Sequence, residues 1–110
     1  MGMNRIKKRG DTVEISVEVY LFQEDDAWIA YCPALDLSAY ADDIDSAEVA
    51  FDESLDLVIE ETVENGTFEK YLLSLGWQIQ NNIPKYTPPQ IQFNRTASKQ
   101  YTERITIPMC

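Results

Sequence analysis

Hydrophobic and polar residues alternate strictly along residues 12–22. A period of two places the apolar residues on one face and the polar residues on the other, which predicts a half-buried β-strand. Residues 27–32 are rich in aromatic and branched residues and follow a polar turn at residues 23–26, so they predict the second strand of a hairpin. Pro33 lacks a backbone donor and ends this pairing, and residues 35–41 alternate again as a third, shorter strand. These segments predict an antiparallel sheet.

Apolar residues recur every three or four positions after Asp45. Asp45 and Glu48 have the spacing of a capping box, in which the first carboxylate accepts from first-turn amides, so a helix is predicted to begin there. Asn65 and Gly66 are typical of its end. The apolar stripe that we expect to lie on the sheet consists of Ala47, Phe51, Leu55, Val58 and Thr62.

A second, short helix is predicted over residues 68–75, with Thr67 as its cap. Residues 80–104 contain three prolines among Asn, Gln and Thr, which favours an extended surface segment. Residues 104–108 alternate once more and predict an edge strand.

These elements predict an α+β fold with a three- to four-stranded antiparallel sheet and one main helix packed on it. The short second helix and an extended C-terminal tail complete it. We assign residues 1–77 to the α+β domain and residues 78–110 to a tail of the same domain. At 110 residues, one core buries roughly 65% of the surface of the unfolded chain, so a single domain is expected.

Charge is arranged in three blocks. Residues 1–9 carry four basic residues, residues 10–69 carry 18 acids and no Lys or Arg, and residues 70–110 carry five basic residues and one acid. The formal net charge is −10. Such a body repels phosphate backbones and attracts basic partners, so we predict a protein partner and no direct nucleic-acid binding. A solvated acidic face that only maintains solubility is an open alternative.

The absence of histidine removes the commonest general base and excludes Ser-His and Cys-His mechanisms. The four glycines are scattered and form no phosphate-binding loop. We therefore predict no enzyme, no cofactor and no metal. Cys32 lies in an apolar run and is predicted to be a buried thiol, reduced like Cys110.

Two groups of acids raise the question of metal binding. Asp42, Asp43 and Asp45 lack the turn glycine and terminal Glu of a calcium loop, so a turn and helix cap are favoured. Asp25 and Asp26 are adjacent, and neighbouring strand residues point to opposite faces, so a shared metal or proton is not expected.

Trp28, Tyr31 and Tyr40 could form a platform for stacking bases, but no Lys or Arg lies between them, which favours packing in the sheet. Acids interrupt every apolar stretch before it reaches the length of a membrane span, and we expect a cytoplasmic protein.

Residues 12–66 resemble the HicB family of antitoxins. The likeness is carried by the two strands, by residues 30–41 (AYCPALDLSAYA), and by the helix opening at residues 42–48 (DDIDSAE). The positions that match the family pattern are Pro33, Asp45, Ser46, Ala47 and Glu48.

The resemblance implies a β-β-β-α-β fold akin to a truncated ribonuclease H sheet, self-association into a dimer or larger oligomer, and capture of a small basic RNA-cleaving toxin of the HicA kind. Family members that control transcription add a DNA-binding domain, and residues 78–110 show none. The partner-binding residues that we predict are Glu48, Asp52, Asp56, Asp42 and Asp43.

Two alternatives stay open at this point. The chain could be a structural or oligomerisation protein of the same fold without a toxin partner. A nuclease would need a metal held by carboxylates alone, with Asp36 or Asp43 among the ligands.

Overall fold

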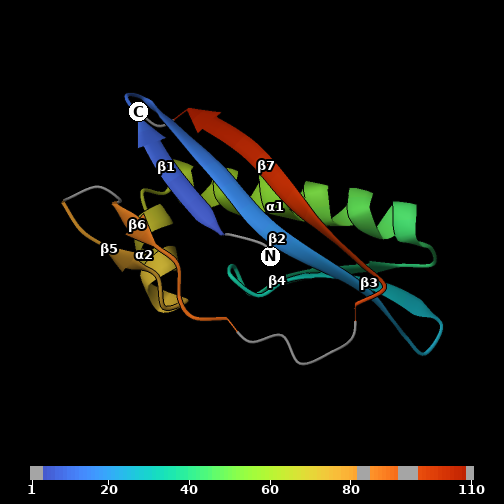
Figure 1. The fold of residues 1–110 in the computed structure, drawn as a ribbon. Coiled ribbons are helices and arrows are strands. Elements are labelled where there is room, and N and C mark those ends of the chain that lie inside the picture. The colour runs from blue at the N-terminus through green and yellow to red at the C-terminus, as the bar shows by residue number, and fades with distance from the viewer. Residues whose placement is uncertain (1–3, 82–84, 92–96, 109–110) are drawn as a thin grey trace.

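The computed structural model describes residues 4–81, 85–91 and 97–108 and shows an α+β fold (Figure 1). One antiparallel sheet has five strands, and a second sheet has two. The strands of the large sheet are β1 (Arg5–Arg9), β2 (Thr12–Glu24), β3 (Ala27–Cys32), β4 (Leu37–Ala41) and β7 (Lys99–Pro108), and those of the small sheet are β5 (Gln78–Ile79) and β6 (Tyr86–Thr87).

The long strand β2 is the centre of the large sheet because it pairs with three strands. Strand β7 pairs with residues 12–21 of β2, β1 with residues 12–16, and β3 with residues 20–24. Residues 12–16 of β2 pair with both β1 and β7, and residues 20–21 pair with both β3 and β7. Strands β1 and β3 therefore lie on the edge of β2 opposite to β7, one after the other along its length. At the gap between them, the Glu18 amide donates to Asn4 Oδ1 at 2.8 Å.

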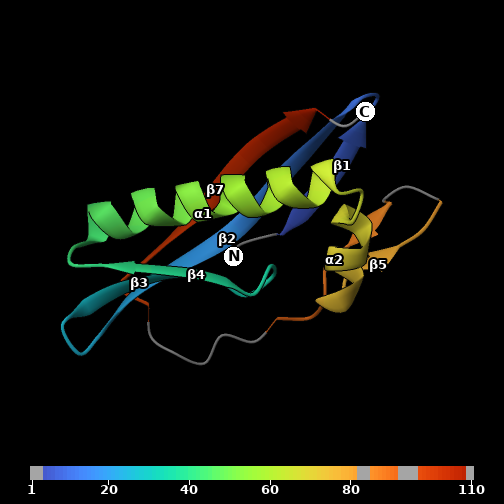
Figure 2. The same ribbon diagram turned by 180° about the vertical axis from the view of Figure 1, so that it is seen from behind.

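Helix α1 (Ile44–Glu64) covers one face of this sheet, as Figure 2 shows. Asp43 is its N-cap and accepts from the Ser46 amide at 2.7 Å. The predicted capping box is therefore wrong: Asp45 lies in the first turn, and the Glu48 side chain contacts Lys99 instead. The helix ends at Asn65 and Gly66 as predicted, with Gly66 at a positive φ of 68°.

The buried stripe of α1 follows a strict four-residue spacing and packs on the alternating apolar residues of β2. Val58 and Thr62 are only half-buried, because the stripe continues through Ile59. The buried residues of α1 are Ala47, Phe51, Leu55 and Ile59, and those of β2 that face them are Val13, Ile15, Val17, Val19 and Leu21.

Helix α2 (Phe68–Ser74) and the small sheet extend this core at one end. Thr67 occupies the N-cap position, but its side chain makes no cap hydrogen bond and lies 3.5 Å from the Thr62 carbonyl. Trp77 follows α2 and is almost fully buried, and its Nε1 donates to the Ala34 carbonyl at 2.8 Å. The chain that leaves α2 is thereby attached to the turn after β3.

Three boundaries differ from the sequence prediction. Strand β1 was not predicted, because only Ile6 of its five residues is apolar and buried. The third strand begins at Leu37, since Asp36 adopts a positive φ of 49° within the turn after Pro33. Strand β7 begins at Lys99, five residues before the predicted start, because pairing with β2 holds polar residues extended. The α+β class, the antiparallel sheet and the single main helix are confirmed.

Candidate functional site

A row of acids follows one side of α1 and forms the most strongly charged feature of the described structure. Its members recur at every fourth residue, so they lie one above the other beside the buried stripe. All except the half-buried Glu48 are exposed. We call this row the acidic flank, and it consists of Glu48, Asp52, Asp56, Glu60 and Glu64.

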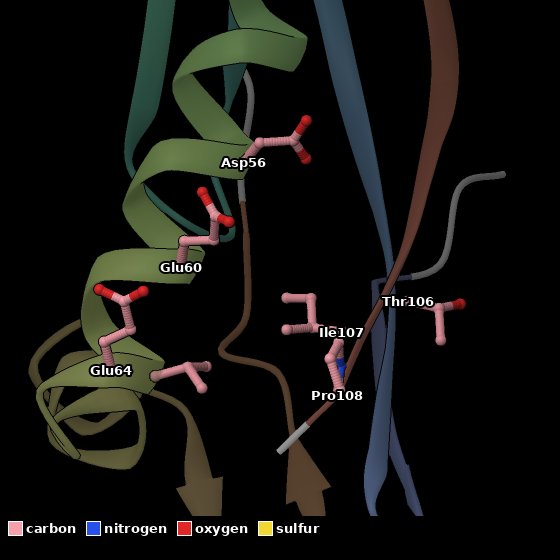
Figure 3. Close-up of a pocket in the computed structure, with 7 residues that line it drawn as sticks. Asp56, Glu60, Glu64, Thr106, Ile107 and Pro108 are labelled. Carbon is pink, nitrogen blue, oxygen red and sulfur yellow. The ribbon is translucent and has the colours of Figure 1, made fainter. Parts of the chain in front are cut away.

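The acidic flank borders a groove between α1 and β7 of about 370 Å³ (Figure 3). Carboxylates of α1 form one wall, and Ile107 and Pro108 of β7 stand on the other side. The groove therefore combines negative charge with apolar surface. Its lining residues are Asp56, Glu60, Val63, Glu64, Thr106, Ile107 and Pro108.

Glu103 adds a sixth carboxyl group that sequence analysis missed. It pairs in register with Val17, so it lies on the face of β7 toward α1. Its carboxyl group is close enough to that of Asp52 for a hydrogen bond, which forms when one of the two groups carries a proton. Burial raises the pKa of Glu103 to about 8, helped by the Asp52 hydrogen bond and by the charges of Asp52, Asp56 and Glu48.

The signal for Glu103 was present in the sequence, but the strand was predicted too short to reveal it. In the full strand, Tyr101, Glu103, Ile105 and Ile107 alternate with polar residues. Glu103 is then a charged residue in the middle of the apolar face, with Lys99 at the start of the same face.

Lys99 at the start of β7 partly neutralises one end of the acidic flank. Its Nζ lies 3.1 Å from Glu48 Oε2. Tyr101 lies between Lys99 and Glu103 in the strand, and its buried hydroxyl has no hydrogen-bond partner among the described residues. Burial raises the pKa of Tyr101, and nearby carboxylates, Glu103 first, raise it further. In the described part of the chain, no ion pair joins the other four acids of the flank.

The structure places the predicted partner-binding residues in two groups. Glu48, Asp52 and Asp56 lie together in the acidic flank. Asp43 caps α1, and its hydrogen bonds to Ser46 lower its pKa. Asp42 is exposed just before the helix. Asp42 and Asp43, at the N-terminal end of α1, therefore lie outside the groove, and the Asp43 side chain is already used as the helix cap.

The acids weighed for metal binding do not gather into a centre. Within the described ranges, no group of three or more Asp, Glu or Cys side chains could hold a metal ion. Asp25 and Asp26 are exposed at the tip of the β2–β3 hairpin, and Asp36 Oδ1 accepts from the Tyr31 hydroxyl at 3.4 Å.

The predicted buried thiol is confirmed. Cys32 is fully buried, and burial raises its pKa to about 11, so it is protonated at neutral pH. Cys110 lies outside the described residues.

Comparison with known proteins gave no match to a family model, to a curated protein or to a solved structure. Among the described residues, no helix has the length and apolar character that a membrane span requires.

Proposed function

We propose that this protein is a HicB-like binding module that captures a small basic protein, of the kind of the RNA-cleaving HicA toxins, on its acidic flank. The observation that supports the proposal is a row of five carboxylates beside the groove, of which only Glu48 has a basic partner in the described structure. The resemblance of residues 12–66 to HicB antitoxins supports the same partner class.

The groove has the chemistry that a basic surface needs. Lys and Arg side chains have an aliphatic stem and a charged end, and they bury the stem when apolar surface is close to an acceptor. Ile107 and Val63 offer that apolar surface, and Asp56, Glu60 and Glu64 offer acceptors. Complementary charge also speeds association and discriminates against acidic proteins.

Repulsion within the acidic flank favours binding over a purely structural role. Like charges four residues apart destabilise a helix by about 0.2–0.5 kcal/mol per pair, so the four consecutive pairs cost roughly 1–2 kcal/mol. A basic partner relieves this repulsion, whereas solvation alone requires no such regular row.

The test compares two charge-reversed proteins with the same net charge. Asp52→Lys/Asp56→Lys changes the acidic flank. Glu53→Lys/Glu61→Lys changes residues rotated about 100° further around α1, away from the groove. Each tagged protein is incubated with extract of the native organism, and the bound proteins are identified by mass spectrometry.

We expect the unmodified protein and the Glu53/Glu61 variant to recover the same small basic protein. The Asp52/Asp56 variant should recover at least tenfold less, and raising the salt concentration should release the partner. Equal recovery by both variants would exclude the acidic flank as the binding surface.

The alternative is a self-associating structural protein, and the long outer edge of β7 favours it. Among the described residues, β7 pairs only with β2, so its other edge has backbone groups available for a strand of a second copy. Recovery of this chain alone, with a concentration-dependent mass in light scattering, would support this alternative.

A further inference from the structure

A second charged surface lies on the face of the large sheet opposite α1. Because side chains alternate along a strand, Arg5, Lys7 and Arg9 of β1 share this face, while Ile6 points toward the core. Arg104 of β7 lies there as well, since it pairs with Ser16, which also pairs with Arg5. We call this surface the basic face, and it consists of Arg5, Lys7, Arg9 and Arg104.

Register places these cations close together although they come from opposite ends of the sequence. Arg5, Ser16 and Arg104 form one row across three strands, which spans about 10 Å at the usual strand spacing. The next row contains Lys7, Glu14 and Thr106. Successive cations of β1 are about 7 Å apart along the strand.

The basic face is open, and two carboxylates, Glu14 and Glu18, lie among its four cations. All four cations are exposed, and Figure 1 looks onto this side of the sheet, with α1 behind it. Arg9 forms an ion pair with Glu14 at 3.2 Å. Glu18, two residues from Ser16 along β2, is buried and accepts hydrogen bonds from Thr102 and Gln100 at 2.7 and 3.2 Å. Arg5, Lys7 and Arg104 have no ion pair among the described residues.

The acids of α1 do not cancel this charge at physiological ionic strength. The acidic flank lies on the other side of the sheet, and exposed charges are largely screened beyond the Debye length of about 8 Å. The formal net charge of −10 is a sum over the whole molecule, and it does not set the electrostatic potential next to the basic face.

We propose that the basic face binds the phosphate backbone of a single-stranded nucleic acid, for which RNA is the probe. Arginine donates two parallel hydrogen bonds to a phosphate, and the neighbouring Ser16 and Thr106 hydroxyls supply further donors. Three strands are wider than the two-stranded ribbon that the DNA major groove admits, so an unpaired strand lying across the sheet fits better than a duplex. This inference departs from the sequence-based expectation, because the two basic ends of the chain meet only in the fold.

The proposal is independent of the acidic flank, and its test uses matched variants. A fluorescent RNA of about 12 nucleotides and mixed sequence is titrated with the full chain, and anisotropy is recorded at 50 and 200 mM salt. Arg5→Gln/Arg104→Gln removes two cations of the basic face. Lys8→Gln/Lys70→Gln makes the same change of net charge, with Lys8 on the other face of β1 and Lys70 on α2.

Three phosphate contacts predict that affinity for RNA falls about 20-fold between the two salt concentrations. In the Arg5/Arg104 variant, binding should weaken at least tenfold at 50 mM salt, and the salt effect should fall to about threefold. The Lys8/Lys70 variant should match the unmodified chain.

Three results would overturn the proposal. They are no binding of RNA at 50 mM salt, an equal loss in both double variants, and tighter binding of a poly-glutamate peptide or a DNA duplex of equal length. The last result would assign the basic face to an acidic protein or to duplex DNA. None of these results bears on capture of a basic protein by the acidic flank, which the Asp52/Asp56 variant tests separately.

Discussion

The carboxyl groups of Glu103 in β7 and Asp52 in α1 lie within hydrogen-bonding reach of each other, between the strand and the helix. Two carboxylates repel each other, so this contact depends on a proton that the folded protein retains. It joins the edge strand of the sheet to the acidic flank, whose further members Asp56, Glu60 and Glu64 line the groove.

This pair makes stability depend on pH. The pKa of Glu103 rises from 4.5 to about 8 on folding, so the folded chain binds a proton that the unfolded chain releases. The stabilisation is complete below about pH 4.5 and is lost as the pH rises through 8. Because Glu103 is only partly buried and water screens its charge, we expect a loss of roughly 1–2 kcal/mol.

Glu103→Gln should remove this loss, since a Gln amide donates to Asp52 at every pH. Urea unfolding at pH 5 and pH 8 should show a smaller difference for Glu103→Gln than for the unmodified chain. Glu53→Gln, an exposed control on α1, should keep the original difference. An unchanged pH dependence in Glu103→Gln would rule out the shared proton.

Asp56→Lys should increase stability while it weakens capture of a basic partner. The substitution replaces two repulsive i,i+4 pairs, with Asp52 and Glu60, by two attractive pairs, which stabilises α1 by about 1 kcal/mol. Chemical unfolding and partner affinity are measured on the same protein. Lower stability, or affinity equal to that of the unmodified chain, would contradict the role assigned to the acidic flank.

Asp43→Ala should lower the thermal midpoint by several degrees, because the Ser46 amide loses its acceptor at the start of α1. Folding lowers the pKa of Asp43, so the contribution of the cap is present above the unfolded pKa and disappears as the pH falls through the folded pKa. Asp42→Ala, which removes the preceding carboxylate, should change the midpoint little. Equal effects of the two substitutions would argue against the cap.

Trp77→Phe should destabilise the fold by about 1–3 kcal/mol, because the Ala34 carbonyl is left buried without its Nε1 donor. Trp28→Phe is the matched control, since Trp28 is only partly buried and packs at the edge of the core. Guanidinium unfolding of both variants provides the comparison. A smaller effect at Trp77 than at Trp28 would contradict the importance of this hydrogen bond.

Several elements were predictable because local pattern decides them. Residues 12–22 alternate with a period of two, and Ala47, Phe51 and Leu55 recur every four residues. Each pattern lies within one segment and is enough to indicate which face is buried. The stop at Asn65 and Gly66 is local as well, since Gly adopts positive φ at little cost. The same helical periodicity predicts that the acids at every fourth residue of α1 lie on one side of the helix.

Other features required the tertiary structure. Both Asp43 and Asp45 stand at positions from which an N-cap of α1 is possible, and only the backbone geometry shows that Asp43 is the cap. Strand β1 has one buried apolar residue, so its formation depends on pairing with β2. The early start of β7 likewise depends on ten residue pairs with β2.

The sequence by itself determined the α+β class, the main helix and the acidic side of that helix, because each depends on residues a few positions apart. Only the tertiary structure decided that Glu103 meets Asp52 and that Arg5 and Arg104 flank Ser16 from the two neighbouring strands. The two pairs of residues are 51 and 99 positions apart in the sequence. Strand register sets them, and a shift of one residue would turn every such side chain to the other face of the sheet.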